Sequence, residues 1–179
     1  MRAKLAAAWP LVESLGGSAT SIPVSDGSVD AVVCAQSFHW FATPPALAEI
    51  HRALRPGGRL GLVWNVKDDR VDWVARLDRI VERHQGDAPR HRSGAWRKVF
   101  PARGFGPLHE DRFPHRHTGP PEVVILDRVR STSVIAALPP DERAKVEDET
   151  RALIADEFPD ASAVTVPYET AAYWVEKTK

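Results

Sequence analysis

The sequence has 179 residues, 43% of them hydrophobic, which suits one domain with a buried core. Its 24 basic and 24 acidic side chains give zero formal net charge, which argues against a chain that binds nucleic acid or an anionic membrane through a positive field. The single cysteine, Cys34, excludes an internal disulfide bond and is expected to be a small core residue. No apolar run approaches the roughly 18 to 20 residues of a membrane span, so we expect a cytoplasmic protein without a membrane segment.

The first 28 residues predict the end of a helix, a short strand and two turns. Residues 2–8 favour helix by propensity, and Pro10 ends that helix because proline disfavours the helical conformation of the residue before it. The stretch "LVESL" at 11–15 is a short strand candidate that a pair of glycines follows, and "SDGS" at 25–28 predicts a second turn.

The next segment predicts a strand, a helix and a strand, with a further helix after them. Residues 30–34 form a nearly unbroken apolar run, which is typical of a strand buried on both faces of a parallel sheet. Thr43 can cap a helix that starts with two prolines and ends at "RPGG", and "RLGLVWN" at 59–65 is the next apolar strand. This βαβ unit makes the sheet at least partly parallel, and residues 73–84 predict another amphipathic helix.

The remaining residues predict a loop, an edge strand, helices and a closing strand. Residues 87–107 read mostly as loop with some helix, and 109–117 as an edge strand because Pro114 cannot donate to a central ladder. The stretch "PPEVVILDRVR" has a helix start and helical spacing, and residues 141–158 form an amphipathic helix with a charged back. Alternation over residues 164–174 predicts the strand that closes the sheet.

The order of these elements resembles the class I S-adenosylmethionine-dependent methyltransferases. Three stretches, "GGSATSIPVSDGSVDAVVCAQSFHWF", "EIHRALRPGGRLGLVWN" and "VPYETAAYW", resemble more narrowly the small-molecule branch that includes trans-aconitate methyltransferase-like proteins, or methyltransferase type 11. The resemblance implies an α/β, Rossmann-like sheet in the order 3-2-1-4-5-7-6, with helices on both faces, an antiparallel last strand and a helical lid insertion. It matches residues 11–15, 30–35, 59–65, 109–117 and the tail to strands 3, 4, 5, 6 and 7.

Strands 1 and 2 of that family have no counterpart in the sequence, which therefore reads as a single N-terminally truncated methyltransferase domain over residues 1–179. Residues 1–86 would be the remaining cofactor-side half, and 87–179 the substrate-side half with the lid helices. The Gly-rich loop and the ribose-binding acid would be absent, so we expect compromised cofactor binding. Strand 4 would become an apolar edge, so self-association or a protein partner is expected along residues 30–36.

The resemblance also implies which residues meet S-adenosylmethionine. It places residues 18–20 beside the adenine and residues 36–38 near the methionine end of the cofactor. The implied cofactor-binding residues are Ser18, Ala19, Thr20, Gln36, Ser37 and Phe38.

Four further residues would face the transferred methyl group or a small-molecule acceptor. The resemblance assigns Trp40, Trp64 and Asn65 to the substrate, and His39 could act as a catalytic general base if the acceptor must lose a proton. Methyl transfer from an activated sulfonium depends mainly on alignment, so no nucleophilic side chain is required. From the residues alone, the simpler interpretation of "HWF" at 39–41 is a staple between a strand end and the next helix.

Other candidate residues favour structural interpretations. His109, His115 and His117 have no acidic or cysteine partner at a fixed spacing, so we expect surface histidines and no metal site. Ser131 and Ser133 could bind a substrate anion, although a turn or a cap is the simpler interpretation.

Two other functions compete with methyl transfer. The first is a non-catalytic, degenerate methyltransferase fold that acts as a binding or regulatory subunit, with a hydrophobic surface along its exposed strand. The second is a nucleotide-dependent oxidoreductase, which has no support in the sequence because no G-x-G-x-x-G loop follows a strand and opens a helix.

Overall fold

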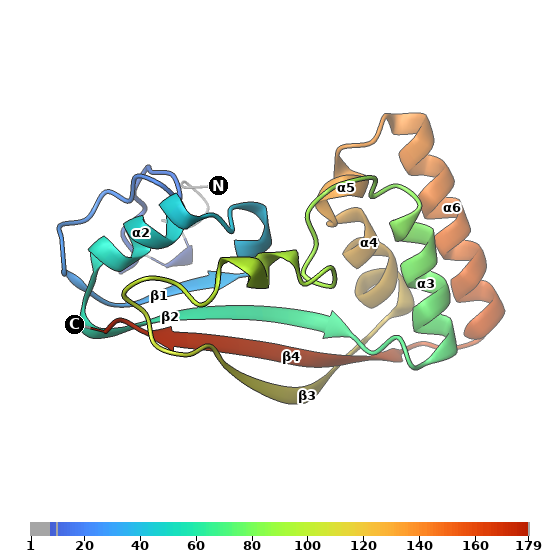
Figure 1. The fold of residues 1–179 in the computed structure, drawn as a ribbon. Coiled ribbons are helices and arrows are strands. Elements are labelled where there is room, and N and C mark those ends of the chain that lie inside the picture. Colours follow the sequence, from blue (N-terminus) through green and yellow to red (C-terminus); the bar gives the residue numbers. More distant parts are fainter. Residues whose placement is uncertain (1–7, 10, 179) are drawn as a thin grey trace. The chain divides into compact units, whose positions relative to one another are not determined.

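The computed structural model describes residues 8–9 and 11–178, and the chain divides into two compact units (Figure 1). The first unit consists of Met1–Val63, Arg90–Glu110 and Ala172–Lys179. The second unit consists of Trp64–Pro89 and Asp111–Ala171. The helix predicted over residues 2–8 lies almost wholly outside the described residues.

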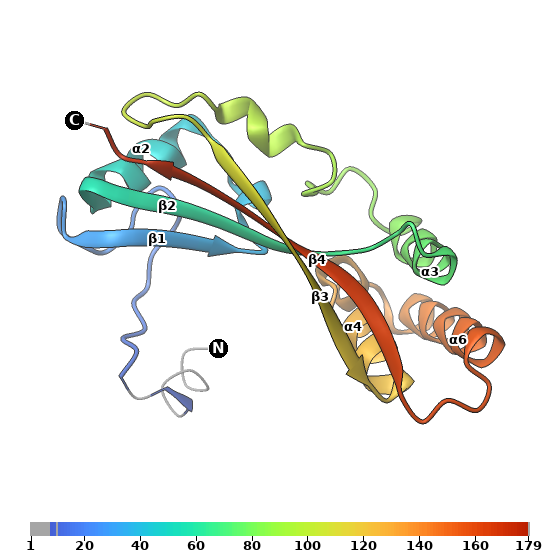
Figure 2. The same ribbon diagram turned by 90° about the horizontal axis from the view of Figure 1, so that it is seen from below.

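The sheet has four strands in the order β1-β2-β4-β3. Their bounds are Val29–Ala35 for β1, Leu54–Lys67 for β2, His109–Gly119 for β3 and Val164–Glu176 for β4. β1 pairs with β2 in parallel, and the arrow of β4 points against those of its neighbours in Figures 1 and 2. This order is the 4-5-7-6 part of the predicted sheet, so the Rossmann-like α/β fold class and its antiparallel closing strand are confirmed.

β1 is a strand as predicted, but the prediction that it is buried on both faces is wrong. Cys34 is its only buried residue, whereas Ala31, Val33 and Ala35 are exposed. The helix α2 (Pro44–Ala53) lies on one side of β1 and β2, and the described part of the first unit places no element on the other side (Figure 1). Among the described residues β1 is also the outermost strand of the sheet.

The strand predicted at residues 11–15 is absent. These residues form a turn and loop, and Leu11, Val12 and Leu15 are exposed. An extended segment needs a neighbouring strand to pair its backbone groups, and no described strand lies beside this one. Local apolarity alone therefore gave the wrong prediction here.

Both ends of α2 are capped by contacts that satisfy its free backbone groups. At the start, the Thr43 side chain accepts a hydrogen bond from the backbone N–H of Ala46 at 3.4 Å. At the end, Lys177 Nζ donates to the carbonyl oxygens of His51 and Leu54 at 2.8 and 2.7 Å. The predicted cap and helix are confirmed, and the last residues of the chain fix the junction between α2 and β2.

Replacing Thr43 with alanine should lower the free energy of unfolding by about 1 kcal/mol, because the N-cap acceptor is lost. Chemical denaturation of both proteins measures the difference. The matched control is Thr43→Ser, which keeps the hydroxyl and should cost a small fraction of that amount. Equal losses in the two variants would show that the methyl group, and not the cap, matters at this position.

The helices of the second unit form one hydrophobic core with the first half of β4. They are α3 (Asp72–Glu82), a π-helical segment (Glu122–Asp127) continued by α4 (Arg128–Arg130), α5 (Ser133–Ala136) and α6 (Pro140–Glu157). Leu77 and Ile80 of α3 and Leu153 of α6 belong to this core. The predicted helices after residues 72, 120 and 140 are confirmed. None of the helices among residues 11–178 is long and apolar enough to cross a membrane.

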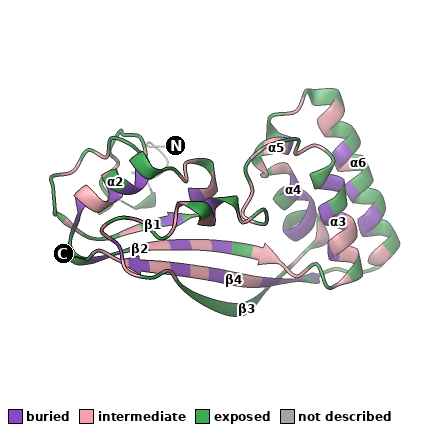
Figure 3. Cartoon of the chain, in the orientation of Figure 1, coloured by how far each residue is buried: buried purple, intermediate pink, exposed green. Residues whose placement is uncertain are grey.

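Burial alternates along β2 and β4, as Figure 3 shows. Leu60, Leu62 and Trp64 of β2 are each at most 1% exposed, and the residues between them are less buried. This period of two is expected when one face of a strand packs on a core. Along this stretch of β2, even-numbered side chains therefore form the core face.

Candidate functional site

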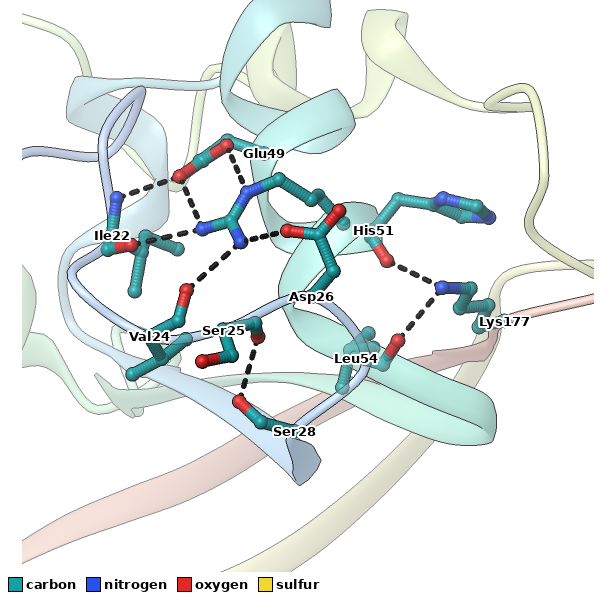
Figure 4. A network of polar contacts seen from close by, with 10 residues as sticks. Ile22, Val24, Ser25, Asp26, Ser28, Glu49, His51, Leu54 and Lys177 are labelled. Carbon is teal, nitrogen blue, oxygen red and sulfur yellow. Dashed lines mark hydrogen bonds and ion pairs between the residues drawn. The ribbon is translucent and has the colours of Figure 1, made fainter.

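The loop that ends at β1 is fastened to α2 by one arginine. The guanidinium group of Arg52 donates to the carbonyl oxygens of Ile22 and Val24, each at 2.9 Å, and to Asp26 Oδ1 at 2.6 Å. It also forms two hydrogen bonds of 2.9 Å with Glu49, whose Oε1 accepts from the backbone N–H of Ile22 at 2.7 Å. Figure 4 shows these loop residues gathered against α2. Bidentate arginine–carboxylate geometry of this kind orients both partners.

The three residues assigned to the adenine lie on a small exposed turn at the start of this loop. The backbones of Ser18 and Ser21 exchange two hydrogen bonds, 3.0 Å and 3.1 Å long. The hydroxyl groups of Ser18 and Thr20 are 3.3 Å apart, and Ala19 is half-buried between them. The turn therefore presents two hydroxyl groups to solvent, where a ligand could accept or donate hydrogen bonds.

The Glu49 carboxyl group should stay ionised in acid. The pKa of Glu49 is lowered from 4.5 to about 2. The hydrogen bond from the Arg52 side chain is the largest cause, and the hydrogen bond from the Ile22 N–H is the second. A carboxyl group whose pKa is lower in the folded than in the unfolded state stabilises the fold at pH values above its unfolded-state pKa. That stabilisation is lost as the pH falls through the folded-state pKa. We expect the loop to stay anchored from neutral pH to about pH 3 and to be released near pH 2.

The carboxyl carbon chemical shift of Glu49, followed by NMR against pH, measures this pKa directly. In the control variant Arg52→Leu, the Glu49 pKa should rise towards its ordinary value, because the main cause of the shift is gone. A Glu49 that titrates above pH 4 in the unaltered protein would contradict the ion-paired loop anchor.

β1 ends in a backbone conformation that is rare for a side chain other than glycine. Gln36 has a φ of 54°, and its N–H donates to the carbonyl oxygen of Val63 in β2 at 2.8 Å. Such left-handed residues cost of order 1 kcal/mol or more and cluster at ligand sites. Ser37 follows and precedes a 3-10 helix at Phe38–Trp40. The turn lies at the carboxyl end of a parallel strand, which is where open α/β sheets bind ligands.

Phe38 anchors this turn in the core of the first unit. Its side chain is 0% exposed, and its ring lies 5.5 Å from that of Phe41, 6.4 Å from Trp96 and 6.1 Å from Phe100. The side chain of Phe38 is therefore a packing element and is not exposed to a ligand.

His39 and Trp40 follow in the same short helix and are more accessible. His39 is half-buried with its ring centroid 5.3 Å from that of Trp40, and Trp40 is 49% exposed. Burial lowers the pKa of His39 below its ordinary 6.5, so that its imidazole is neutral at physiological pH. The first unit thus brings together the predicted residues from Gln36 to Trp40, with a neutral histidine that could accept a proton.

Trp64 and Asn65, the other two predicted substrate residues, belong to the second unit. Trp64 is 1% exposed, so its ring packs in the core. The exposed Asn65 accepts a hydrogen bond from the Thr170 hydroxyl at 2.9 Å, and that hydroxyl lies 3.5 Å from His115 Nδ1. Sequence reasoning did not find Thr170, because its partner is 105 residues away and no local pattern signals the contact.

The remaining candidates have structural contacts. His109 stacks on Trp174 with 3.9 Å between the ring centroids, and no three potential metal ligands cluster in the part of the chain that the structure describes. The Ser131 hydroxyl donates to the carbonyl oxygen of Arg128 at 2.8 Å, as expected if Ser131 belongs to a turn. Ser133 is the first residue of α5.

Comparison with known sequences identifies methyltransferases. Residues 1–62 match the family model described as a methyltransferase domain. The chain is 41% identical over 172 residues to an uncharacterized methyltransferase-like protein of Schizosaccharomyces pombe, covering 94% of this chain. It is 38% identical over 168 residues to an uncharacterized methyltransferase of Mycobacterium tuberculosis, covering 93% of this chain. The chain spans 66% of the length of each of these two relatives.

Comparison with solved structures supports the fold. A proposed type II methyltransferase from Anaeromyxobacter dehalogenans superposes with a TM-score of 0.59 at 19% sequence identity. The match covers 91% of this chain and 69% of that chain. At this identity the likeness shows that the two chains share a fold.

Proposed function

Because this chain belongs to the class I S-adenosylmethionine-dependent methyltransferases, we propose that the protein transfers the methyl group of S-adenosylmethionine to a small-molecule acceptor. The observation that carries the proposal is the strained turn at Gln36, which lies at the carboxyl end of β1 next to β2. In open α/β sheets this position meets the ligand, and backbone strain is retained where a site requires it.

The residues of the first unit fit the cofactor in their chemistry. Ser18 and Thr20 offer exposed hydroxyl groups on a turn whose loop Arg52 holds, which suits a polar adenosine. Gln36 and Ser37 offer polar side chains at the strand end for the methionine portion. S-adenosylmethionine supplies a methyl group already activated on a sulfonium, so the protein contributes binding, alignment and, where needed, a proton acceptor.

The affinity of residues 1–179 for the cofactor should be low. Within residues 1–179 the resemblance matches neither the family's Gly-rich loop nor its ribose-binding acid. Charge-assisted hydrogen bonds contribute roughly 1.5 to 3 kcal/mol each, so the absence of two would weaken binding by about two to four decades. We therefore expect binding in the weak range that NMR detects more readily than calorimetry.

The neutral imidazole of His39 is the proposed proton acceptor. Burial lowers the pKa of His39, which keeps its ring neutral at physiological pH, as a general base requires. Trp40 beside it is half-exposed and offers an aromatic face to the acceptor or to the sulfonium cation. On the second unit, Asn65 is the exposed polar candidate, whereas the buried Trp64 supports the strand from within the core.

A non-catalytic binding or regulatory role is the second candidate, and one observation favours it. Within the described residues, β1 pairs with β2 alone, and Val33 on this strand is 66% exposed. Such an edge recruits another strand. This role predicts association without turnover.

Incubation with methyl-labelled S-adenosylmethionine and cell extract separates the candidates. The extract is divided into a low-molecular-weight fraction, protein and nucleic acid, and the label in each is counted. The proposal predicts label in the small molecules and none when S-adenosylhomocysteine is added in excess. Label in protein or nucleic acid would contradict a small-molecule acceptor. Cofactor binding with no transfer in any fraction would favour the non-catalytic role.

A further inference from the structure

Ion pairs join the two helices α3 and α6 of the second unit, which lie side by side in Figures 1 and 2. Arg76 of α3 pairs with Asp156, at 2.8 Å, and with Glu157. Arg83, the residue after α3, pairs with Glu149. The two contacts run in opposite order along the two helices, so α3 and α6 are antiparallel and each arginine meets an acid of the other helix.

Arg79 lies between these two ion pairs on the same side of α3, three residues after Arg76 and four before Arg83. At this level α6 offers Ala152 and Leu153, whose side chains carry no hydrogen-bond acceptor. Among the described residues, no carboxylate pairs with Arg79. The row of ion pairs between the helices is therefore interrupted at its middle, where a cation has no anion opposite.

A groove with a volume of about 670 Å³ lies along the same row. This α3/α6 groove is lined by charged residues of both helices and by three apolar residues, Ile80, Ala152 and Leu153. Ile80 and Leu153 are buried, so they form an apolar floor below the charged rim. The volume falls within the roughly 300 to 1,000 Å³ that is typical of small-molecule sites. Every lining residue belongs to the second unit, and none is assigned to the cofactor or to the methyl acceptor.

We propose that the α3/α6 groove binds a small organic acid, whose carboxylate pairs with Arg79 and whose apolar body lies on Ile80 and Leu153. Arginine binds carboxylates through two parallel hydrogen bonds, and this geometry selects a planar anion. The ion pairs on either side show that carboxylates fit between these two helices. The ligand would supply the missing acid of the row and join α3 to α6. This site does not depend on the proposed methyl transfer.

Neither of the two acids that line the groove is available to replace the ligand. Glu149 is engaged by Arg83, and Asp156 is engaged by Arg76. Turning either acid towards Arg79 would break an existing ion pair to form another. An added carboxylate gains its contact with Arg79 without that loss.

An NMR titration of the isotope-labelled protein with hexanoate tests the proposal. We expect saturable chemical-shift changes at the Arg79 side chain and at the backbone amides of Ile80 and Leu153, with a dissociation constant in the millimolar range. 1-Hexanol has the same chain length without the charge, and inorganic phosphate has charge without an apolar body. Each should bind at least about ten-fold more weakly than hexanoate. An equal response to either control, or hexanoate shifts only outside the groove, would overturn the proposal.

Replacing Arg79 with methionine should abolish hexanoate binding, because it removes the charge and keeps an apolar side chain of similar length. The matched control is Arg116→Met, which removes an exposed arginine from β3 in the same unit. This control should bind hexanoate as the unaltered protein does. Unchanged binding by the Arg79→Met variant would overturn the proposal.

Ala152 allows an independent test, because a longer side chain at this position can supply the missing acid. Ala152 is exposed on α6, so its replacement should not disturb the fold. Ala152→Glu should weaken hexanoate binding at least about ten-fold, since the new carboxylate pairs with Arg79. Ala152→Gln has the same size without the charge and should weaken binding much less. Equal losses in the two variants, or undiminished binding by Ala152→Glu, would overturn the proposed pairing with Arg79.

Discussion

Replacing Phe38 with alanine should lower the free energy of unfolding by about 3 to 5 kcal/mol. The ring is 0% exposed and lies at the centre of an aromatic cluster, so its removal leaves a cavity that the fixed strand end cannot fill. Phe38 also anchors the turn after Gln36, and the loss should therefore loosen the candidate cofactor site as well as the fold. Denaturant-induced unfolding, followed by tryptophan fluorescence, gives the difference.

Trp40 provides the control for this prediction because it belongs to the same short helix. Its side chain is 49% exposed, so Trp40→Ala should cost less than about 1 kcal/mol. If the two substitutions destabilise the protein equally, the ring of Phe38 is not the anchor of the turn.

If the acceptor must lose a proton, replacing His39 with asparagine should lower the rate of methyl transfer about 10²- to 10⁴-fold. The affinity for the cofactor should be unchanged. Asparagine keeps a polar side chain but cannot accept a proton at neutral pH. Because burial lowers the pKa of His39, the base becomes protonated at a lower pH than an ordinary histidine. The midpoint of the acid limb of the rate profile of the unaltered protein should accordingly lie below the ordinary histidine pKa of 6.5.

The rate is measured with labelled S-adenosylmethionine and the acceptor fraction that takes up the label. His109→Asn is the matched control, because His109 stacks on Trp174 and has no proposed role in the reaction. A His39→Asn variant that keeps its rate, with an unchanged pH profile, would remove His39 from the mechanism and leave alignment as the source of catalysis.

The sequence predicted the elements whose signals are local. Thr43 with two prolines marks the start of α2, and the apolar run before Ala35 marks β1. The prediction of a strand at residues 11–15 was wrong, because the pairing of a strand depends on neighbouring strands that a local sequence pattern does not reveal. The exposure of Val33 was missed for the same reason, since an apolar run does not say how many faces of a strand are covered.

The candidate site was predicted in part. The resemblance located Gln36 to Trp40, and the structure adds the strained φ of Gln36, which sequence alone does not encode for a residue other than glycine. The burial of Trp64 could have been predicted, because Leu60, Leu62 and Trp64 are large apolar residues at every second position of β2. The contacts of Arg52 with residues 22–26 bridge up to 30 positions and leave no periodic signal.

The central claim is that S-adenosylmethionine binds at the adenine turn and at the end of β1. An NMR titration of the isotope-labelled chain with S-adenosylhomocysteine tests it most directly, because chemical shifts locate even weak binding. The account predicts saturable chemical-shift changes concentrated at residues 18–20 and 36–40. NADH is the control ligand and should leave the chemical shifts of these residues unchanged. Shifts elsewhere, no shifts at saturating ligand, or an equal response to NADH would contradict it.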